Sequence, residues 1–151
     1  MKPTTGGFTL IEVLVALVIF AVGLLGIAAL HIESLNAGRT AINRTKAVAL
    51  ASDLADRIRA NRAACTELGC AYEGSGTLNL ACESTTGCTP AELAAHDVFR
   101  WRSQGNAQLP TFASLVDYTF RADVPDDYLI RIEWVEPGST ALARYELRLQ
   151  L

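Results

Sequence analysis

The feature that most constrains this chain is a long apolar run near its N-terminus. From Val13 to Ile32 the only polar side chain is that of His31. An α-helix rises about 1.5 Å per residue, so a run of about twenty residues covers roughly 30 Å, the thickness of a bilayer core. Because such a helix is apolar all round, it has to be covered by lipid or by other apolar helices. The run therefore predicts a membrane-spanning helix.

The residues before this run do not follow the order of a secretory signal peptide. A signal peptide has its small-residue cleavage site after the apolar region. Here Gly6 and Gly7 come before it, so cleavage after Gly7 would leave the helix on the mature chain. Lys2 is the only positively charged side chain of residues 1–7. Its charge predicts a cytoplasmic leader, with the bulk of the chain on the other side of the membrane.

Glu12 is the only charged residue between Phe8 and Leu30. A carboxylate in a membrane helix costs about 2.5–3.5 kcal/mol at the centre and less near the interface. Glu12 is therefore expected either to stay solvated among the headgroups or to find a positive partner. Cleavage after Gly7 would create such a partner, the free α-amine of Phe8.

Residues 7–17 read Gly-Phe-Thr-Leu-Ile-Glu-Val-Leu-Val-Ala-Leu and resemble the N-terminal signal of type IV pilins and of the pseudopilins of type II secretion. In that family a prepilin peptidase cuts after the glycine and methylates the new amine, and the glutamate guides methylation and assembly. The resemblance implies leader cleavage between Gly7 and Phe8, N-methylation of Phe8, and an assembly role for Glu12 through charge pairing. The combination of glycine, phenylalanine, glutamate and apolar helix at this spacing is specific to the family.

Beyond the apolar run the pattern becomes that of an amphipathic helix. Apolar residues recur at helical spacing and charged residues fall between them; the apolar positions are Leu35, Ile42, Leu50, Leu54 and Ile58, with Ala47, Ala51 and Ala55 beside them. There is no proline between Phe8 and Ala64. The sequence thus predicts one helix of about fifty residues, roughly 80 Å long.

The end of this helix carries a second resemblance. Residues 49–55 (Ala-Leu-Ala-Ser-Asp-Leu-Ala) and 56–62 (Asp-Arg-Ile-Arg-Ala-Asn-Arg) resemble the minor pilins called PilV, or type IV pilus modification proteins. Arginines at this place also suit the negative end of a helix dipole. The second resemblance is less specific than the first, and it implies a minor pilin.

The cysteines gather in one short, loop-rich stretch after the helix, at Cys65, Cys70, Cys82 and Cys88. An even number of cysteines in an exported segment favours disulfides, and the intervals are wider than those of a zinc site. Four cysteines permit three pairings. The pairing Cys65–Cys70 with Cys82–Cys88 is favoured, and the nested pairing Cys65–Cys88 with Cys70–Cys82 is a close second. The sequence does not decide between them.

The rest of the chain predicts a short helix and three strands. Thr89, Pro90 and Glu92 form the signature of a helix start, with His96 and Asp97 expected as surface or cap residues. Period-two alternation predicts strands over 117–124, 128–136 and 141–151. Short turns make these an antiparallel meander whose apolar face the amphipathic helix covers. The fold class is therefore α+β and pilin-like.

The predicted organisation is a leader (1–7), a transmembrane or filament-core helix (8–32), an amphipathic helix half (33–63) and a globular head (64–151). The chain lacks a metal quartet, a phosphate loop and a nucleophile motif. We therefore expect no catalytic residues, no metal and no cofactor, and hence no enzyme. A net charge of −3 gives no nucleic-acid footprint.

The resemblance implies a minor pilin that is incorporated into or primes a type IV pilus, with roles in pilus assembly, adhesion and twitching motility. Its implied partners are other pilin subunits, the prepilin peptidase, the pilus assembly platform and the inner membrane. The head would lie in the periplasm first and at the pilus or cell surface afterwards. Two alternatives stay open: a minor pseudopilin of a type II secretion system, and a single-pass membrane-anchored binding domain that does not polymerise.

Overall fold

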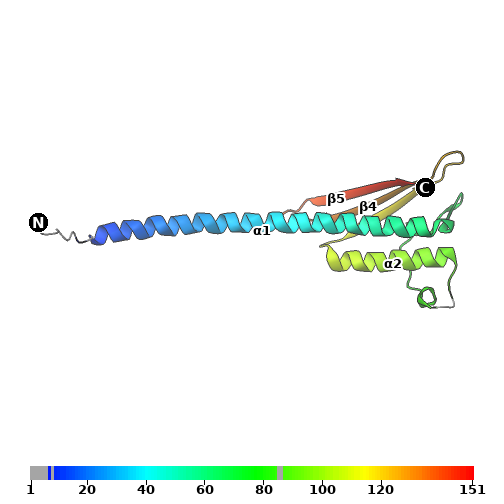
Figure 1. The fold of residues 1–151 in the computed structure, drawn as a ribbon, viewed down its shortest axis with the longest axis horizontal. Helices are drawn as coiled ribbons and strands as arrows, with labels where there is room; N and C mark the ends of the chain where they lie inside the picture. The colour runs from blue at the N-terminus through cyan, green and yellow to red at the C-terminus, as the bar shows by residue number, and fades with distance from the viewer. Residues whose placement is uncertain (1–6, 8, 85–86) are drawn as a thin grey trace, which may run out of the picture. The chain divides into compact units, whose positions relative to one another are not determined.

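The computed structural model describes residues 7, 9–84 and 87–151. Its elements follow in the order α1 (Leu10–Ala60), η1 (Arg62–Ala64), β1 (Cys65–Thr66), β2 (Gly69–Cys70), η2 (Ala71–Glu73), η3 (Leu80–Glu83), α2 (Pro90–Gln108), β3 (Ala113–Thr119), β4 (Asp127–Val135) and β5 (Leu142–Gln150) (Figure 1). The predicted α+β architecture, a long N-terminal helix with a small antiparallel sheet, is confirmed.

The chain divides into two compact units, residues 1–38 and 39–151. The N-terminal unit contains the apolar part of α1. The globular unit contains the rest of α1, the second helix and both sheets. The division falls between Gly38 and Arg39.

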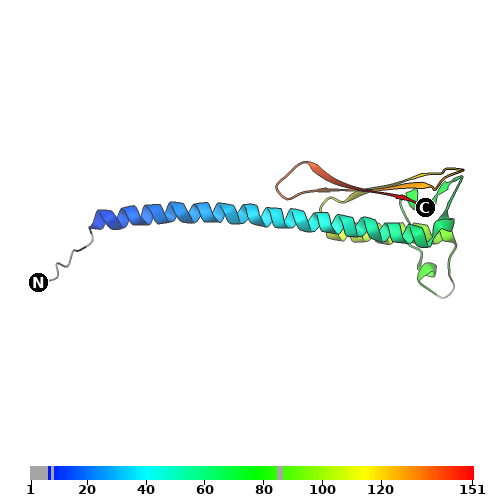
Figure 2. The same cartoon turned by 45° about the horizontal axis from the view of Figure 1, so that its top comes forward.

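The main sheet is the predicted meander, with strand order β3-β4-β5 and antiparallel pairing throughout. Figure 2 shows this sheet nearly edge-on. The central strand β4 alternates strictly, and its inward side chains Tyr128, Ile130, Ile132 and Trp134 are buried, as predicted. Because β4 has neighbours on both edges, its inner face lies in the middle of the core. That position explains why period-two alternation located it so well.

The first strand differs from its prediction. It spans Ala113–Thr119 rather than 117–124, so Phe120 and Val124 of the predicted apolar face are exposed. Val116, opposite Ile130, is the buried residue of β3. The chain leaves the sheet after Thr119 because the next residues form a turn, in which the Arg121 amide donates to Asp126 Oδ1.

The second half of α1 supplies one wall of the core. Its leucine, isoleucine and alanine side chains are buried at Ala47, Leu50, Ala51, Leu54, Ala55 and Ile58. The buried stripe begins at Asn43, and Ile42 of the predicted stripe is exposed, as is Leu35 in the N-terminal unit. Periodicity gives the direction of the stripe, but only the extent of the layers packed against it fixes where burial begins.

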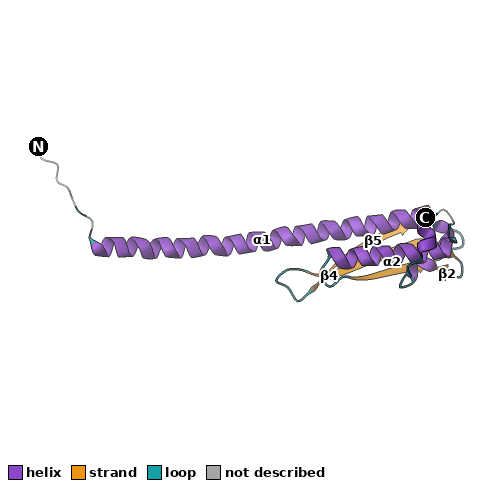
Figure 3. Cartoon of the chain, turned by 90° about the horizontal axis from the view of Figure 1, so that it is seen from below, coloured by secondary structure: helices purple, strands orange, loops and turns teal. Residues whose placement is uncertain are grey.

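Helix α2 runs beside the second half of α1 (Figures 1 and 3) and begins as predicted. Thr89 Oγ1 accepts from the Glu92 amide at 3.3 Å, and Glu92 Oε2 accepts from the Thr89 amide at 2.8 Å. The hydrogen bonds that Glu92 Oε2 accepts from the amide and the hydroxyl of Thr89 lower the pKa of the Glu92 carboxyl. The helix continues past Gly105 to Gln108. Gly105 is buried there, because a Cβ atom at this position would overlap the ring of Phe112.

Trp101 connects α2 to the rest of the core. Its side chain is fully buried, and Nε1 donates to the carbonyl oxygen of Leu50 in α1 at 2.8 Å. Its ring meets Phe112 edge to face, with 5.7 Å between ring centroids. One side chain thus joins both helices to the segment that leads into β3.

The loop between η2 and α2 approaches α2 closely at Gly76. Its φ of +78° lies in the left-handed region, and a Cβ atom would overlap the backbone nitrogen of Phe99. Gly87 has a similar φ of +72° but open space around it. Alanine substitutions at the two glycines therefore distinguish the cost of the left-handed backbone conformation from the cost of steric overlap.

We expect Gly76→Ala to destabilise the globular unit more than Gly87→Ala. A left-handed φ costs an alanine about 1–2 kcal/mol, which sets the loss for Gly87→Ala. Gly76→Ala adds the overlap with α2, so the loop has to move. Urea denaturation of the detergent-solubilised chain, followed by tryptophan fluorescence, measures both losses. Equal losses would contradict a close packing of Gly76 on α2.

Candidate processing and assembly site

The start of α1 is built by Thr9 and Glu12. Thr9 precedes the first helical residue, and its carbonyl oxygen accepts from the amides of Glu12 at 3.1 Å and Val13 at 3.3 Å. Its hydroxyl oxygen also accepts from the Glu12 amide, at 3.4 Å. A carboxylate in the first turn is favoured by the positive end of the helix dipole. Glu12 therefore suits the helix start for structural reasons as well as for its charge.

Thr9 carries a helix-start signal that can be read from the sequence. Thr9 and Glu12 have the Thr-x-x-Glu spacing of a capping box, the same signature that located the start of α2.

The cleavage junction is only partly within the described residues. Gly7 is exposed, and a Cβ atom there would have no heavy atom within 4 Å. Phe8 and residues 1–6, including Lys2, lie outside the described residues. Cleavage between Gly7 and Phe8, methylation of Phe8 and pairing of its amine with Glu12 therefore stay predictions.

The surface next to this junction is apolar and uncovered. Every residue from 9 to 35 is exposed. Within the part of the chain that the structure describes, α1 is the one helix long and apolar enough to cross a membrane, with a mean hydropathy of 3.0 in its most apolar window. Within the N-terminal unit no other described element packs on this surface. Such a surface needs lipid or partner helices to cover it.

Two family models match adjoining ranges of the chain. The model described as the prokaryotic N-terminal methylation motif matches residues 3–28. The model described as Type IV pilin Tt1218 matches residues 29–99. The chain belongs to the type IV pilin family. No curated protein and no solved structure matches this pilin significantly.

Membership of the family has direct consequences for this pilin. The methylation-motif match spans Gly7, Phe8 and Glu12. Pilins are structural proteins rather than enzymes, and the two matches make this chain a component of a pilus or pseudopilus. Pilins with this motif are processed by a prepilin peptidase and associate with other pilin subunits. The apolar helix suits membrane anchoring. Among the described residues, no cluster of His, Cys, Asp and Glu has the arrangement of a metal site.

An ion-pair network ties the two helices of this pilin together. Arg57 of α1 bonds Asp53 Oδ2 at 3.0 Å and Asp97 Oδ1 of α2 at 2.7 Å. The Tyr72 hydroxyl, from η2, lies 3.2 Å from Asp97 Oδ2 and 3.1 Å from the carbonyl oxygen of Arg57. Burial lowers the pKa of Arg57, but the two carboxylates outweigh it and raise the pKa overall. Arg57, near the end of α1, thus links the two helices as well as complementing the helix dipole.

The prediction that His96 and Asp97 are surface or cap residues is wrong. Their exposed fractions are 6% and 9%. Asp97 is buried in the network with Arg57 and Tyr72, and His96 lies between Asn79 and Glu83. These partners are far away in sequence, 40 residues for Arg57 and 17 for Asn79. Local pattern therefore gave no sign of them.

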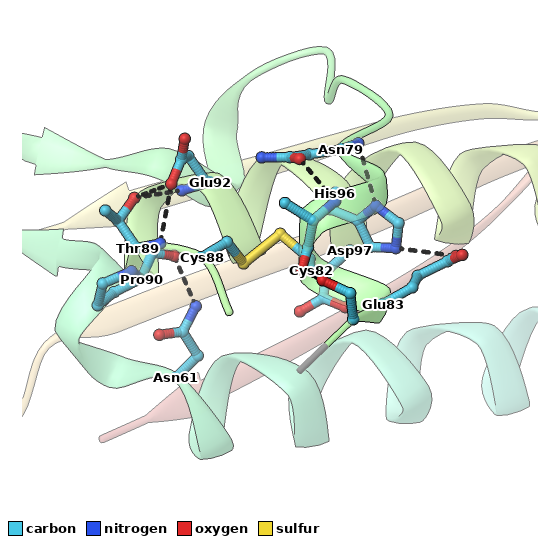
Figure 4. The surroundings of a disulfide bond; sticks show 12 residues. Asn61, Asn79, Cys82, Glu83, Cys88, Thr89, Pro90, Glu92, His96 and Asp97 are labelled. Carbon is cyan, nitrogen blue, oxygen red and sulfur yellow. Dashed lines mark hydrogen bonds and ion pairs between the residues drawn. A yellow bond between two sulfur atoms is a disulfide. The ribbon is translucent and has the colours of Figure 1, made fainter. Parts of the chain in front are cut away.

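The cysteines form the disulfides Cys65–Cys70 and Cys82–Cys88, which is the adjacent rather than the nested pairing. The first is explained by the β1–β2 hairpin, because its antiparallel register places Cys65 opposite Cys70. The second closes the segment between η3 and α2 (Figure 4). Both bridges link residues close in sequence, so they hold loops locally rather than tie distant elements together.

Tyr72, which is buried, and Tyr118, which is partly buried, predict a loss of stability at alkaline pH. Burial, with a smaller contribution from Asp97, raises the pKa of Tyr72, and burial together with the Asp126 hydrogen bond raises the pKa of Tyr118 to about 12. In the unfolded chain a tyrosine titrates near pH 10. The folded state therefore holds these protons more tightly. The stabilisation is complete below about pH 10 and is lost as pH rises through the folded values.

We expect the free energy of unfolding to fall between pH 9.5 and pH 12, as measured by urea denaturation. Tyr72→Phe should make this decline shallower, because one titrating group is removed. A pH dependence that is unchanged in Tyr72→Phe would exclude this tyrosine as a cause.

Proposed function

We propose that this pilin is a minor, PilV-type subunit of a type IV pilus. In this proposal a prepilin peptidase cuts after Gly7 and methylates Phe8. The subunit then enters or primes a filament with other pilin subunits at the pilus assembly platform. The observation that carries the proposal is the uncovered apolar surface of α1, most of which lies within the methylation-motif match.

The apolar surface supports assembly because of its size and position. Exposure of this surface to water would cost roughly 25 cal/mol per Å², so the helix has to stay covered before and after assembly. Lipid covers the surface while the subunit is in the inner membrane, and sister helices cover it in a filament. Transfer between the two exchanges one apolar environment for another. The Glu12 carboxylate is costly to bury both in the membrane and in the filament core. The positive charge of a methylated amine at Phe8 would neutralise it.

The proposed organisation follows from this mechanism. Residues 1–7 form the leader on the cytoplasmic side, and residues 8–32 form the membrane and filament-core helix. The amphipathic half (33–63) and the head (64–151) are periplasmic first and then exposed on the pilus or cell surface. Adhesion and twitching motility are the roles that the PilV resemblance of residues 49–62 supports.

We expect Glu12→Leu to leave the protein stable in the membrane but to reduce its amount in sheared pili several-fold. The leucine adds apolar surface while it removes the partner of the Phe8 amine. Quantitative immunoblots of membrane and pilus fractions measure both quantities. Glu33→Leu is the matched control, since Glu33 is also exposed on α1 but lies outside the methylation-motif match. Normal incorporation of Glu12→Leu would count against the pairing.

A deletion strain separates the proposed function from its alternatives. Loss of pili and twitching motility, with normal protein secretion, is the expected result. Loss of protein secretion with normal pili would instead identify a minor pseudopilin of type II secretion, whose N-terminal signal is the same. A strain normal in both, with the protein absent from sheared filaments, would favour a membrane-anchored binding domain that does not polymerise.

A further inference from the structure

The segment before η3 is held against α2 by its backbone. The Thr77 amide donates to the carbonyl oxygen of Ala95 at 3.0 Å. The Asn79 amide donates to Nδ1 of His96 at 3.2 Å (Figure 4). We call residues 77–79 the docked segment. Of the two hydrogen bonds just described, one is therefore accepted by a titratable side chain, that of His96.

The hydrogen bonds fix the protonation state of His96 in this arrangement. Because Nδ1 accepts from an amide, it carries no proton, and the neutral ring has its proton on Nε2. Nε2 faces Glu83 Oε1 of η3 at 3.5 Å. Both ring nitrogens of a buried side chain are thus engaged with the same loop, one with its backbone and one with a carboxylate.

We propose that His96 is a pH-sensitive latch that holds the docked segment while it is neutral and releases it when it is protonated. An imidazolium ring is a donor at both nitrogens. Its Nδ1–H would face the Asn79 N–H, so that contact would be lost. At the same time the 3.5 Å contact between Nε2 and Glu83 would become an ion pair and hold the η3 end more firmly. The docked segment would therefore swing out around Glu83.

The charges around His96 come from each element packed against it. Glu83 of η3 favours the protonated ring, while Arg100, one turn along α2, lies 3.4 Å from the same carboxylate and opposes it. Asp97 is turned to Arg57 of α1 and Tyr72 of η2. Glu92, at the start of α2, is bonded to Thr89. Glu83 is therefore the carboxylate that sets the balance.

Release would change the surface of the globular unit. Leu78, in the docked segment, and Leu80, at the start of η3, are already exposed, with exposed fractions of 50% and 65%. Movement of the docked segment would rearrange this apolar surface. The latch does not depend on how the pilin assembles.

Amide hydrogen exchange of the full chain in detergent micelles tests the latch. The protection factor of the Asn79 amide, corrected for the intrinsic effect of pH, is compared at pH 7.5 and pH 5. We expect it to fall roughly tenfold, the effect of losing one hydrogen bond. The amides of β4 should keep their protection and show that the fold persists. An Asn79 protection factor that is equal at both pH values overturns the proposal.

His96→Asn is the decisive variant, because the asparagine Oδ1 can accept from the Asn79 amide but does not titrate. Its Asn79 protection should be independent of pH, whereas His31→Asn, in the N-terminal unit, should behave as the unmodified chain does. A fall in the Asn79 protection factor from pH 7.5 to pH 5 in His96→Asn as large as that in His31→Asn would overturn the proposal. Should His96→Asn fail to fold, the imidazole ¹⁵N spectrum of the unmodified chain decides. It has to show an unprotonated Nδ1 at pH 7.5 that gains its proton together with the loss of Asn79 protection.

Discussion

A Gly7→Val chain should accumulate as the uncleaved precursor, with no detectable mature form. The peptidase cuts after this glycine in the family to which the chain belongs, and a branched side chain at the cleaved bond would not fit a site that accepts glycine. The fold itself should tolerate the change, because a Cβ atom at Gly7 has open space around it. The size of the protein on a denaturing gel and the N-terminal residue by mass spectrometry measure the result.

Gly6→Ala is the control for this experiment, since it alters the neighbouring glycine and leaves the residue at the cleaved bond unchanged. Its product should begin with N-methylated Phe8, as that of the unmodified chain should. Efficient conversion of Gly7→Val to the mature size would contradict cleavage at this bond. An unmethylated Phe8 in the unmodified chain would leave cleavage intact but exclude the methylation.

The second large effect is expected in the globular unit, where Trp101→Ala should cost about 3–5 kcal/mol of stability. The substitution leaves a cavity between the two helices and removes the hydrogen bond to the Leu50 carbonyl. Since domains of this size are stable by only about 5–15 kcal/mol, much of the variant would be unfolded or degraded. Urea denaturation, followed by the fluorescence of Trp134, measures the loss.

Phe120→Ala is the matched control, because Phe120 is an aromatic residue of the same unit that is exposed at 38%. It should change stability by no more than about 0.5 kcal/mol. Trp101→Phe should fall between the two, since it keeps most of the apolar volume but not the hydrogen bond. Equal losses for Trp101→Ala and Phe120→Ala would show that the Trp101 contact contributes little.

The elements that were predicted well depend on local rules. The start of α2 follows from Thr89, Pro90 and Glu92, which are adjacent in sequence. The strand β4 follows from alternation in a strand covered on its inner face. Gly105 lies inside α2 and packs against the ring of Phe112, a contact that no local rule indicates.

The misassigned residues depend on contacts between distant segments. The bounds of β3 are set by its register with β4, and the burial of Asp97 is set by Arg57 across the helix pair. Thr9 is the exception, since its capping spacing could be read from the sequence and was overlooked.

The sequence by itself determined the apolar helix, the methylation motif and the α+β fold class. Each of these depends on the order and spacing of neighbouring residues. The helix and strand patterns follow directly from backbone geometry. The tertiary structure alone decided where burial begins on α1, which cysteines pair, and why His96 and Asp97 are inside. The reason is that hydrogen bonds and packing join residues by distance in space, and the folded chain places Asn79 and Arg57 beside α2 although nothing in the sequence near them marks the contact.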